Sequence, residues 1–159
     1  MKTNILLIGM PGSGKSTVGR ILAKKTGMQQ IDTDRLLERS EGMRLQDIID
    51  TRGLDYFSEL ECAALCAIDV KNCVITPGGS AVYYPNAMEH LKKSCTVVYL
   101  KADLDALLKS IRDMDSRGIA MKPGQSFEAL LLEREPLYEK YADVKVEALS
   151  APPGRIAHR

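Results

Sequence analysis

The sequence has little net charge and no long hydrophobic run. Its 22 Lys and Arg residues nearly balance 21 Asp and Glu, for a formal net charge of +1, so no broad basic field exists to hold nucleic acid or an anionic membrane. The longest apolar run near the start, Ile5–Ile8, is far too short for a membrane span or a signal-peptide core. We therefore expect a cytoplasmic monomer that acts on a small molecule and binds anions only through a local cluster.

Cysteine is scarce and lacks the spacing of a metal or redox site. None of the four cysteines forms a C-x-x-C pair; Cys62 and Cys66 fall four residues apart in a helical pattern. A metal site would need more ligands, and only His90 and His158 are available. Free buried thiols in a reducing compartment are the simplest interpretation.

The size and the alternation of elements predict one α/β domain over residues 1–159. With 159 residues, 45% hydrophobic and 27% charged, the chain has the composition of a globular protein with a substantial core. Expected strands are 4–8, 29–31, 73–76, 95–100 and 144–147; expected helices are 16–25, 35–41, 45–50, 56–69, 87–93, 104–112 and 127–141, the last interrupted by Pro136. Alternating strands and helices favour a three-layer, doubly wound parallel sheet of about five strands.

A glycine-rich phosphate loop follows the first expected strand. Residues 9–16 read G-M-P-G-S-G-K-S and fit G-x-x-x-x-G-K-[S/T] in full. Glycines let consecutive backbone N–H groups surround a phosphate at a helix N-terminus, where negative charge is favoured. Lys15 can reach the β- and γ-phosphates, and the Ser16 hydroxyl can bind Mg²⁺. The predicted contacts to a nucleoside triphosphate are Gly12, Ser13, Gly14, Lys15, Ser16 and Thr17.

Two acidic residues after the second expected strand favour a kinase over a regulatory GTPase. No N-K-x-D motif for guanine is present, and the D-x-x-G matches at 50–53 and 115–118 do not follow strands. Asp32 and Asp34 end a strand at the edge of the sheet where ligands bind. On an extended segment they would point to opposite sides, one toward the metal and the other toward an acceptor hydroxyl. The alternative is that Asp34 only caps the next helix.

These features resemble the shikimate kinases over nearly the whole chain. The matching segments are G-M-P-G-S-G-K-S-T at 9–17, D-T-D at 32–34, Gly53 with Phe57 and Glu61, T-P-G-G-S at 76–80, a lid-like stretch around Arg117, E-R-E-P-L-Y at 133–138, and A-D-V at 142–144. The resemblance implies a P-loop NTPase fold of the nucleoside-monophosphate-kinase type. It also implies ATP as phosphoryl donor, Mg²⁺ as cofactor and shikimate as acceptor.

The resemblance further implies a role for each matching residue. Lys15 would stabilise the transferring charge, Ser16 would hold Mg²⁺ with Asp32 behind it, and Asp34 would activate the acceptor hydroxyl. A lid of about residues 113–125, broken by glycine and proline, would bring Arg117 onto the phosphates. The remaining implied contacts are Arg112 on adenine, backbone N–H groups of Gly78 and Gly79 on the substrate, and Arg134 on its carboxylate.

The departures from the family pattern fall on the acceptor side and the lid. Ser58, counted among the expected substrate contacts, stands where the family carries an arginine that shares the substrate carboxylate with Arg134. Losing a charged hydrogen bond there would cost about 1.5–3 kcal/mol, or roughly 10- to 150-fold in binding. Pro77 replaces a glycine and removes one backbone donor, and Gly118 replaces a proline of the lid.

Three functions therefore remain open. Shikimate is the leading acceptor, with Arg52 or Arg44 as possible replacements for the missing guanidinium. The acceptor could instead be another small hydroxyl metabolite, such as a sugar acid or an amino-acid alcohol. From a different class, the chain could be a nucleotide-binding regulatory protein without acceptor turnover; the retained Asp34 and Arg134 argue against that reading, and Ser58 argues for it.

Overall fold

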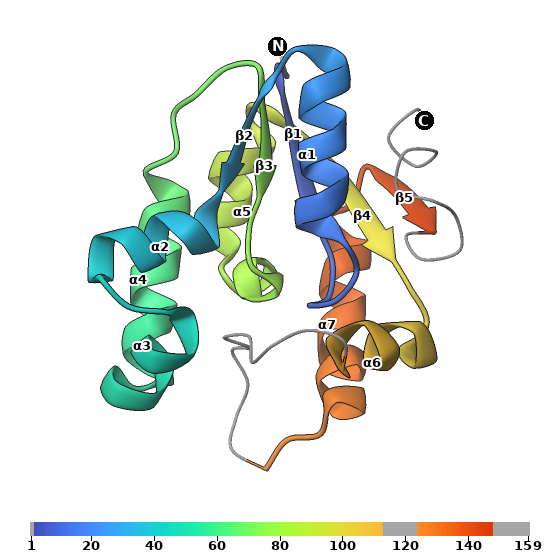
Figure 1. Ribbon diagram of the computed structural model, residues 1–159. Coiled ribbons are helices and arrows are strands. Elements are labelled where there is room, and N and C mark those ends of the chain that lie inside the picture. The colour runs from blue at the N-terminus through green and yellow to red at the C-terminus, as the bar shows by residue number, and fades with distance from the viewer. Residues whose placement is uncertain (1, 113–123, 148–159) are drawn as a thin grey trace.

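Five parallel strands form one sheet at the centre of the molecule (Figure 1). The computed structural model describes residues 2–112 and 124–147. The strands are β1 Asn4–Ile8, β2 Gln29–Asp32, β3 Cys73–Thr76, β4 Cys95–Lys101 and β5 Val144–Glu147. Their order is β2-β3-β1-β4-β5, and each neighbouring pair is parallel. The predicted α/β fold with five parallel strands is confirmed, and the carboxyl ends of all strands meet at one edge.

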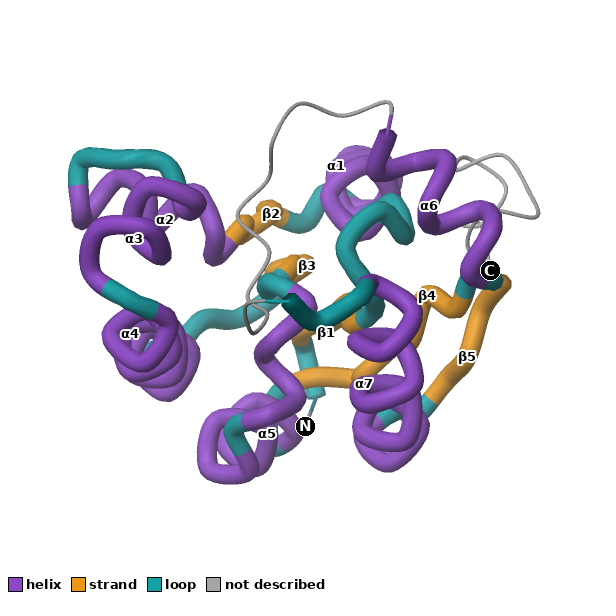
Figure 2. Tube along the Cα trace, turned by 90° about the horizontal axis from the view of Figure 1, so that it is seen from below, coloured by secondary structure: helices purple, strands orange, loops and turns teal. Residues whose placement is uncertain are grey.

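Helices cover both faces of this sheet, which makes three layers (Figure 2). Because side chains alternate along a strand, Leu7 and Val74 pack against Val18 of α1 (Lys15–Thr26). Their neighbours Leu6 and Ile75 belong to a larger core on the opposite face. The helices of that face are α5 (Pro85–Lys92) and α7 (Phe127–Tyr141). The doubly wound architecture follows from strands that are apolar on both sides.

Three helices form a separate lobe beside the β2 edge of the sheet. They are α2 (Thr33–Glu41), α3 (Leu45–Arg52) and α4 (Leu54–Cys66), and we call them the α2–α4 lobe. The lobe has its own small core of Leu37, Leu45, Ile48 and Phe57. It is continuous in sequence from β2 to the connection into β3, so it stands beside the sheet edge as a unit (Figure 1).

Two local predictions need correction. Helix α7 runs through Pro136 without interruption. Proline has no N–H group, so the Leu132 carbonyl one turn earlier loses its helical hydrogen bond. Leu132 is 67% exposed, so water is close to this carbonyl. A 3-10 helix, η1 (Gly79–Tyr83), was not expected and follows β3 directly. The remaining helix, α6 (Leu104–Arg112), has its predicted bounds.

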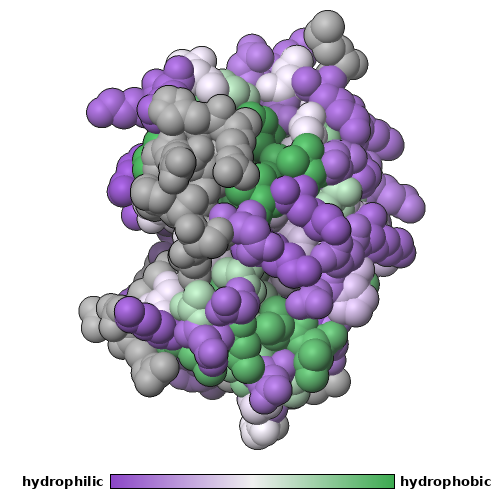
Figure 3. All heavy atoms as spheres, turned by 90° about the vertical axis from the view of Figure 1, so that its right-hand side faces the viewer, coloured by the Kyte–Doolittle hydropathy of each residue, from purple (hydrophilic) through white to green (hydrophobic). Residues whose placement is uncertain are grey.

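The expectation of buried cysteines holds for only two of the four within the described residues. No helix in residues 2–112 and 124–147 is long and apolar enough to cross a membrane. Figure 3 shows hydrophilic side chains spread over one face between smaller hydrophobic areas. All four cysteines are free; Cys73 and Cys95 are buried as expected, whereas Cys62 and Cys66 are only partly buried. Most of the expected lid, including Arg117, lies outside the described residues.

Candidate active site

The phosphate loop lies between the carboxyl end of β1 and the N-terminus of α1. Gly14 caps α1 with φ 90°, a left-handed conformation that glycine adopts without steric cost. The Lys15 ammonium donates to the carbonyl oxygens of Gly9 at 2.8 Å and Met10 at 3.0 Å. The loop therefore folds around its own lysine, which stays 8% exposed at the start of the helix. Such a loop places backbone N–H groups and one cation where a phosphate chain binds.

A hydroxyl and a carboxylate meet beside the loop. The Ser16 hydroxyl donates to Asp32 Oδ2 at 3.2 Å. Asp32 is the N-cap of α2, because its Oδ1 accepts from the backbone N–H of Asp34 at 3.2 Å. The capping role considered for Asp34 thus belongs to Asp32, and Asp34 is left to face the cavity. Hard oxygen ligands of this kind suit Mg²⁺, which usually takes only one or two protein ligands beside phosphates and water.

Asp32 and Asp34 do not lie on one extended segment, so the predicted divergence by strand alternation is wrong. Thr33 and Asp34 are the first residues of α2 rather than an extended continuation of β2. The helix begins directly after Asp32 because the Asp32 side chain satisfies an N–H group of the first turn. Both carboxylates nevertheless line the same cavity. The helical turn therefore achieves what strand alternation was expected to provide.

A single cavity of about 330 Å³ joins the phosphate loop, the α2–α4 lobe and the loop after β3. Its lining includes ten predicted site residues: Gly12, Gly14, Lys15, Ser16, Thr17, Asp32, Asp34, Gly78, Gly79 and Arg134. Arg44, suggested from the sequence as a replacement cation, also lines it, and residues without a site role from the sequence complete it: Pro11, Arg35, Glu38, Leu45, Gln46, Phe57, Glu61, Thr76, Pro77 and Ser80. Residues far apart in sequence thus converge on one site at the carboxyl edge of the sheet.

Of the four other predicted residues, Ser13 and Ser58 do not line the cavity, and the side chains of Arg112 and Arg117 lie outside the described part of the structure. Ser13 is buried within the phosphate loop. Ser58 is partly buried on α4, and its hydroxyl hydrogen-bonds with Tyr84. Burial raises the pKa of Tyr84, and the hydrogen bond with Ser58 opposes this shift. Arg112 is the last residue of α6. Arg117 lies outside the described residues.

Arg134 is a buried cation held by aromatic side chains. It is 1% exposed, and its Nε donates to the Tyr83 hydroxyl at 3.3 Å while the guanidinium lies 5.2 Å from the centre of that ring. Burial raises the pKa of Tyr138 to about 12, so this hydroxyl stays protonated and donates to Gly79 O at 2.7 Å. These contacts fix both the guanidinium and the Gly79 backbone at one wall of the cavity.

Gly78 and Gly79 are small because charged side chains approach them closely. A Cβ on Gly79 would lie 2.8 Å from Arg134 Nη1. A Cβ on Gly78 would lie 2.8 Å from Glu61 Oε2 and 2.9 Å from Asp34 Oδ1. Any side chain at these positions would displace the guanidinium or the two carboxylates, which are part of the cavity wall. Two consecutive glycines therefore separate a carboxylate pair from a guanidinium.

Glu61 is the buried acidic residue of the site that the sequence analysis did not assign. It is 1% exposed, and its Oε1 accepts hydrogen bonds from Tyr84 at 2.7 Å and from Ser80. Burial raises the pKa of this carboxyl, although the hydrogen bonds from Ser80 and Tyr84 oppose that shift. An available signal was its position: Phe57, Glu61 and Leu65 are spaced by four on the buried face of α4, and an acid on such a face needs partners.

Comparisons with known proteins find the family that the sequence resembles. A sequence model described as shikimate kinase matches residues 11–159. The chain is 36% identical over 154 residues to a shikimate kinase of Sulfurihydrogenibium sp., covering 96% of this chain and 92% of that one. It is 38% identical over 156 residues to a shikimate kinase of Pseudomonas aeruginosa, covering 94% and 89%. A solved shikimate kinase from Acinetobacter baumannii, in complex with shikimate, aligns with a TM-score of 0.89 at 29% identity, over 99% of this chain and 90% of that chain.

Proposed function

The chain belongs to the shikimate kinase family, and from that premise we propose that it transfers the γ-phosphoryl group of ATP to the 3-hydroxyl of shikimate. The observation that carries this proposal is the joint lining of one cavity by Lys15, Asp34 and Arg134. These residues supply a phosphate ligand, a carboxylate for a hydroxyl, and a cation for a carboxylate. A phosphoryl donor and an anionic alcohol can therefore be held side by side.

Phosphoryl transfer depends chiefly on positioning and on charge stabilisation. Asp34 orients the acceptor hydroxyl and takes its proton while the oxygen bonds to the γ-phosphorus and the bond to the bridging oxygen of ADP breaks. Lys15 leaves the carbonyl oxygens of Gly9 and Met10 to bind the phosphates. Mg²⁺, held by Ser16 with Asp32 behind it, would neutralise phosphate charge when bound. Arg112 and Arg117 remain proposed nucleotide contacts.

Arg134 is the proposed anchor for the shikimate carboxylate. The guanidinium is already buried and oriented by Tyr83, so little side-chain entropy is lost when a carboxylate binds. Of the two arginines suggested as replacements at the Ser58 site, Arg44 lines the cavity and Arg52 lies over the Tyr56 ring at 5.3 Å. Arg44 is therefore the better placed second cation.

Ser58 also favours a second candidate, a kinase of another small hydroxyl acid. The deciding experiment is ADP release coupled to a spectroscopic assay, with Mg-ATP and shikimate, for the wild type, Ser58→Arg and the exposed control Ser40→Arg. We expect the wild type to turn over sub-millimolar shikimate and Ser40→Arg to match it. Activity only in Ser58→Arg would mean that the acceptor has changed. Silence in all three, with ATP still bound, would favour the regulatory alternative.

We extend the proposal to a cytoplasmic monomer. The four free cysteines are typical of a reducing compartment. The near-neutral charge gives no support for a nucleic-acid partner. Size-exclusion chromatography with light scattering would test the monomeric state, and a stable dimer at micromolar concentration would contradict it.

A further inference from the structure

Two cysteines that the proposed reaction does not use lie one turn apart on α4. Cys62 and Cys66 are four residues apart in this helix, so their side chains share one face. Both are free and only partly buried. Burial raises the pKa of the Cys66 thiol, and the neighbouring Cys62 thiol raises it further. The two sulfurs are therefore close enough to interact with each other.

An amide from α5 contacts both sulfurs. The Cys62 thiol donates to Asn86 Oδ1 at 3.5 Å, and Asn86 Nδ2 donates to Cys66 Sγ at 3.6 Å. Asn86 is the second residue of α5, which packs against α4. One side chain thus spans the pair and orients both thiols toward the contact between the two helices.

The helical spacing argues against a direct bond between these sulfurs. Side chains four residues apart on a helix have Cβ atoms about 5–6 Å apart, whereas a disulfide needs about 3.5–4.5 Å. The helix is regular here, since the Ala67 N–H donates to the Ala63 carbonyl at 3.1 Å, so a disulfide would have to distort this turn. One ion between the sulfurs fits better, because two bonds of about 2.3 Å, the length of a zinc–thiolate bond, span up to about 4.6 Å.

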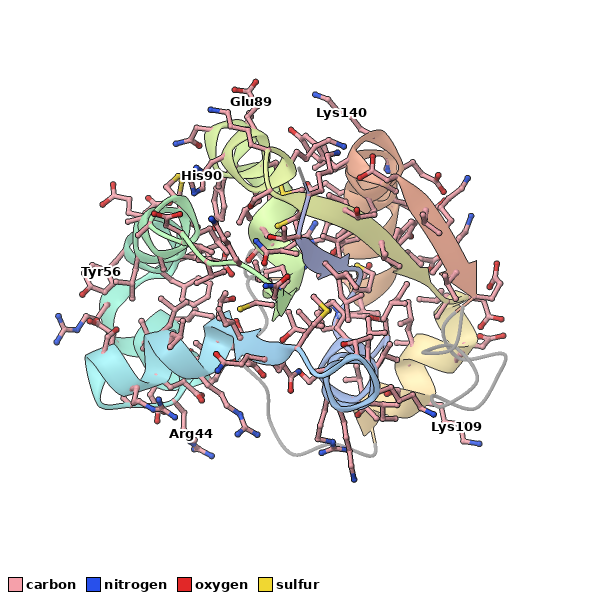
Figure 4. The ribbon with its side chains drawn as sticks, turned by 90° about the horizontal axis from the view of Figure 1, so that it is seen from above. Arg44, Tyr56, Glu89, His90, Lys109 and Lys140 are labelled. Carbon is pink, nitrogen blue, oxygen red and sulfur yellow. The ribbon has the colours of Figure 1, made fainter. Side chains whose placement is uncertain are left out.

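The number of available ligands decides which ion fits. Within residues 2–112 and 124–147, no group of three or more His, Cys, Asp and Glu side chains could hold a metal ion. His90, one turn after Asn86, has its Nε2 2.6 Å from the Ile68 carbonyl oxygen (Figure 4). A tetrahedral ion such as Zn²⁺ therefore lacks ligands. Thiolates also select the soft ion Cu⁺, which two sulfurs are enough to hold. The expectation that a metal site needs more ligands thus applies to Zn²⁺ and not to Cu⁺.

We propose that Cys62 and Cys66 bind one soft, two-coordinate cation of the Cu⁺ class on the side of α4 that packs against α5. Both thiols release their protons to solvent, and each sulfur forms one bond to the ion. Cys62 gives up its hydrogen bond to Asn86 Oδ1. Asn86 Nδ2 continues to donate to Cys66 and offsets the negative charge of the bis-thiolate complex. These three residues do not line the cavity, so the inference is independent of the proposed function.

The test is an anaerobic competition for Cu⁺ between the reduced protein and bicinchoninate, read from the absorbance of the copper–bicinchoninate complex. The variants are Cys62→Ser and Cys66→Ser, with Cys73→Ala and Cys95→Ala as controls that each remove a buried thiol. We expect wild type and both controls to bind one ion per chain. Either serine variant should bind about 10²- to 10⁴-fold more weakly, because a chelate becomes a single contact.

Three outcomes of this competition would overturn the proposal. They are no transfer of copper to the wild type, equal binding by the serine variants, and loss of binding in the alanine controls, which would assign the ion to the buried thiols. Thermal unfolding of each copper-free variant checks that the fold is kept. Copper X-ray absorption should show two sulfur neighbours and no second copper. A copper–copper distance would mean that chains share a cluster, and the proposed site would be wrong.

Asn86→Asp tests the amide separately from the thiols. Aspartate has the same shape but lacks the N–H donor to Cys66, and an acidic residue is favourable in the first turn of α5. Copper affinity should fall about 10- to 100-fold, as is typical when a group that hydrogen-bonds to a metal ligand is changed. The unfolding midpoint of the copper-free protein should match the wild type or exceed it. Unchanged copper affinity would overturn the role of Asn86.

Discussion

The two ends of the cavity are built in different ways. The proposed nucleotide end consists mainly of consecutive residues, 9–17, on one strand–loop–helix unit, and its lysine is held by backbone carbonyls of the same loop. The proposed acceptor end is assembled from α2, α4, the loop after β3 and α7, which contribute Asp34, Glu61, Gly78 and Arg134. A local motif keeps its geometry as long as the chain continues through it. An assembled site depends on packing. A single difference, such as serine in place of the family's arginine at position 58, can therefore change the acceptor end without affecting the nucleotide end.

The largest expected effect is at the acceptor end. Asp34→Asn should lower kcat for shikimate phosphorylation about 10²- to 10⁴-fold, because the amide cannot take the hydroxyl proton. ATP affinity, measured by calorimetry, should stay within about twofold, which would show that the two ends are separable. Asp69→Asn, at an exposed position, is the matched control. Unchanged turnover in Asp34→Asn would contradict its assignment.

The reciprocal change is at the nucleotide end. Lys15→Met should lower kcat about 10²- to 10³-fold, the range seen when one donor to a developing negative charge is removed. Shikimate binding, followed by titration in the absence of ATP, should persist. Lys24→Met on the exposed side of α1 provides the control. If Lys15→Met lost shikimate binding as strongly as turnover, the two ends would not be independent.

Arg134→Lys should affect mainly the acceptor KM. A lysine cannot reproduce the planar guanidinium or its contact with Tyr83, so KM for shikimate should rise roughly 10- to 150-fold. The KM for ATP should be unchanged in the same coupled assay. Arg39→Lys, at an exposed position of α2, should behave as wild type. A rise in both KM values would indicate that Arg134 supports the whole cavity.

A smaller effect is expected for Arg44→Ala. Arg44 lines the cavity, and its side chain is 71% exposed. Its Nε lies 3.6 Å from Asp47 Oδ2, and Figure 4 shows it at the outer edge of the α2–α4 lobe. Exposed ion pairs contribute about 0.2–1 kcal/mol, so the KM for shikimate should rise about 1.4- to 5-fold. Arg52→Ala, whose side chain lies over Tyr56, should have no effect. The reverse ranking would show that Arg52 is the second cation.

The smallest expected effect concerns the pH dependence of stability. Burial raises the pKa of Glu61, so the folded state keeps this proton to a higher pH than the unfolded chain does. Stability contributed by the protonated form is present below the unfolded value, about pH 4.3, and is lost as the pH rises through the folded value. The difference in Tm between Glu61→Gln and wild type should therefore shift in favour of Gln from about pH 4 to pH 7. A difference that stays constant over this range would be inconsistent with a raised pKa.

Much of the fold could be predicted from the sequence because the signals were local. The apolar runs at 4–8 and 95–100 became the central strands β1 and β4, and the helix after the phosphate loop began within one residue of its predicted start. The predictions failed where a tertiary or capping contact decided the outcome. Asp32 began α2 earlier than expected by capping it, and α7 continued through Pro136.

The candidate site also has a part that local sequence determines and a part that tertiary contacts determine. The sequence by itself determined the phosphate loop, since residues 9–17 bring their donors together through covalent continuity and the preferences of glycine. Tertiary structure alone decided the carboxylate pair at Gly78, because Glu61 reaches that wall only through the packing of α4 against η1 and α2. It also decided that Arg44 rather than Arg52 lines the cavity. A contiguous motif needs only the chain, whereas groups far apart in the sequence meet only when burial of the core holds their helices in one place.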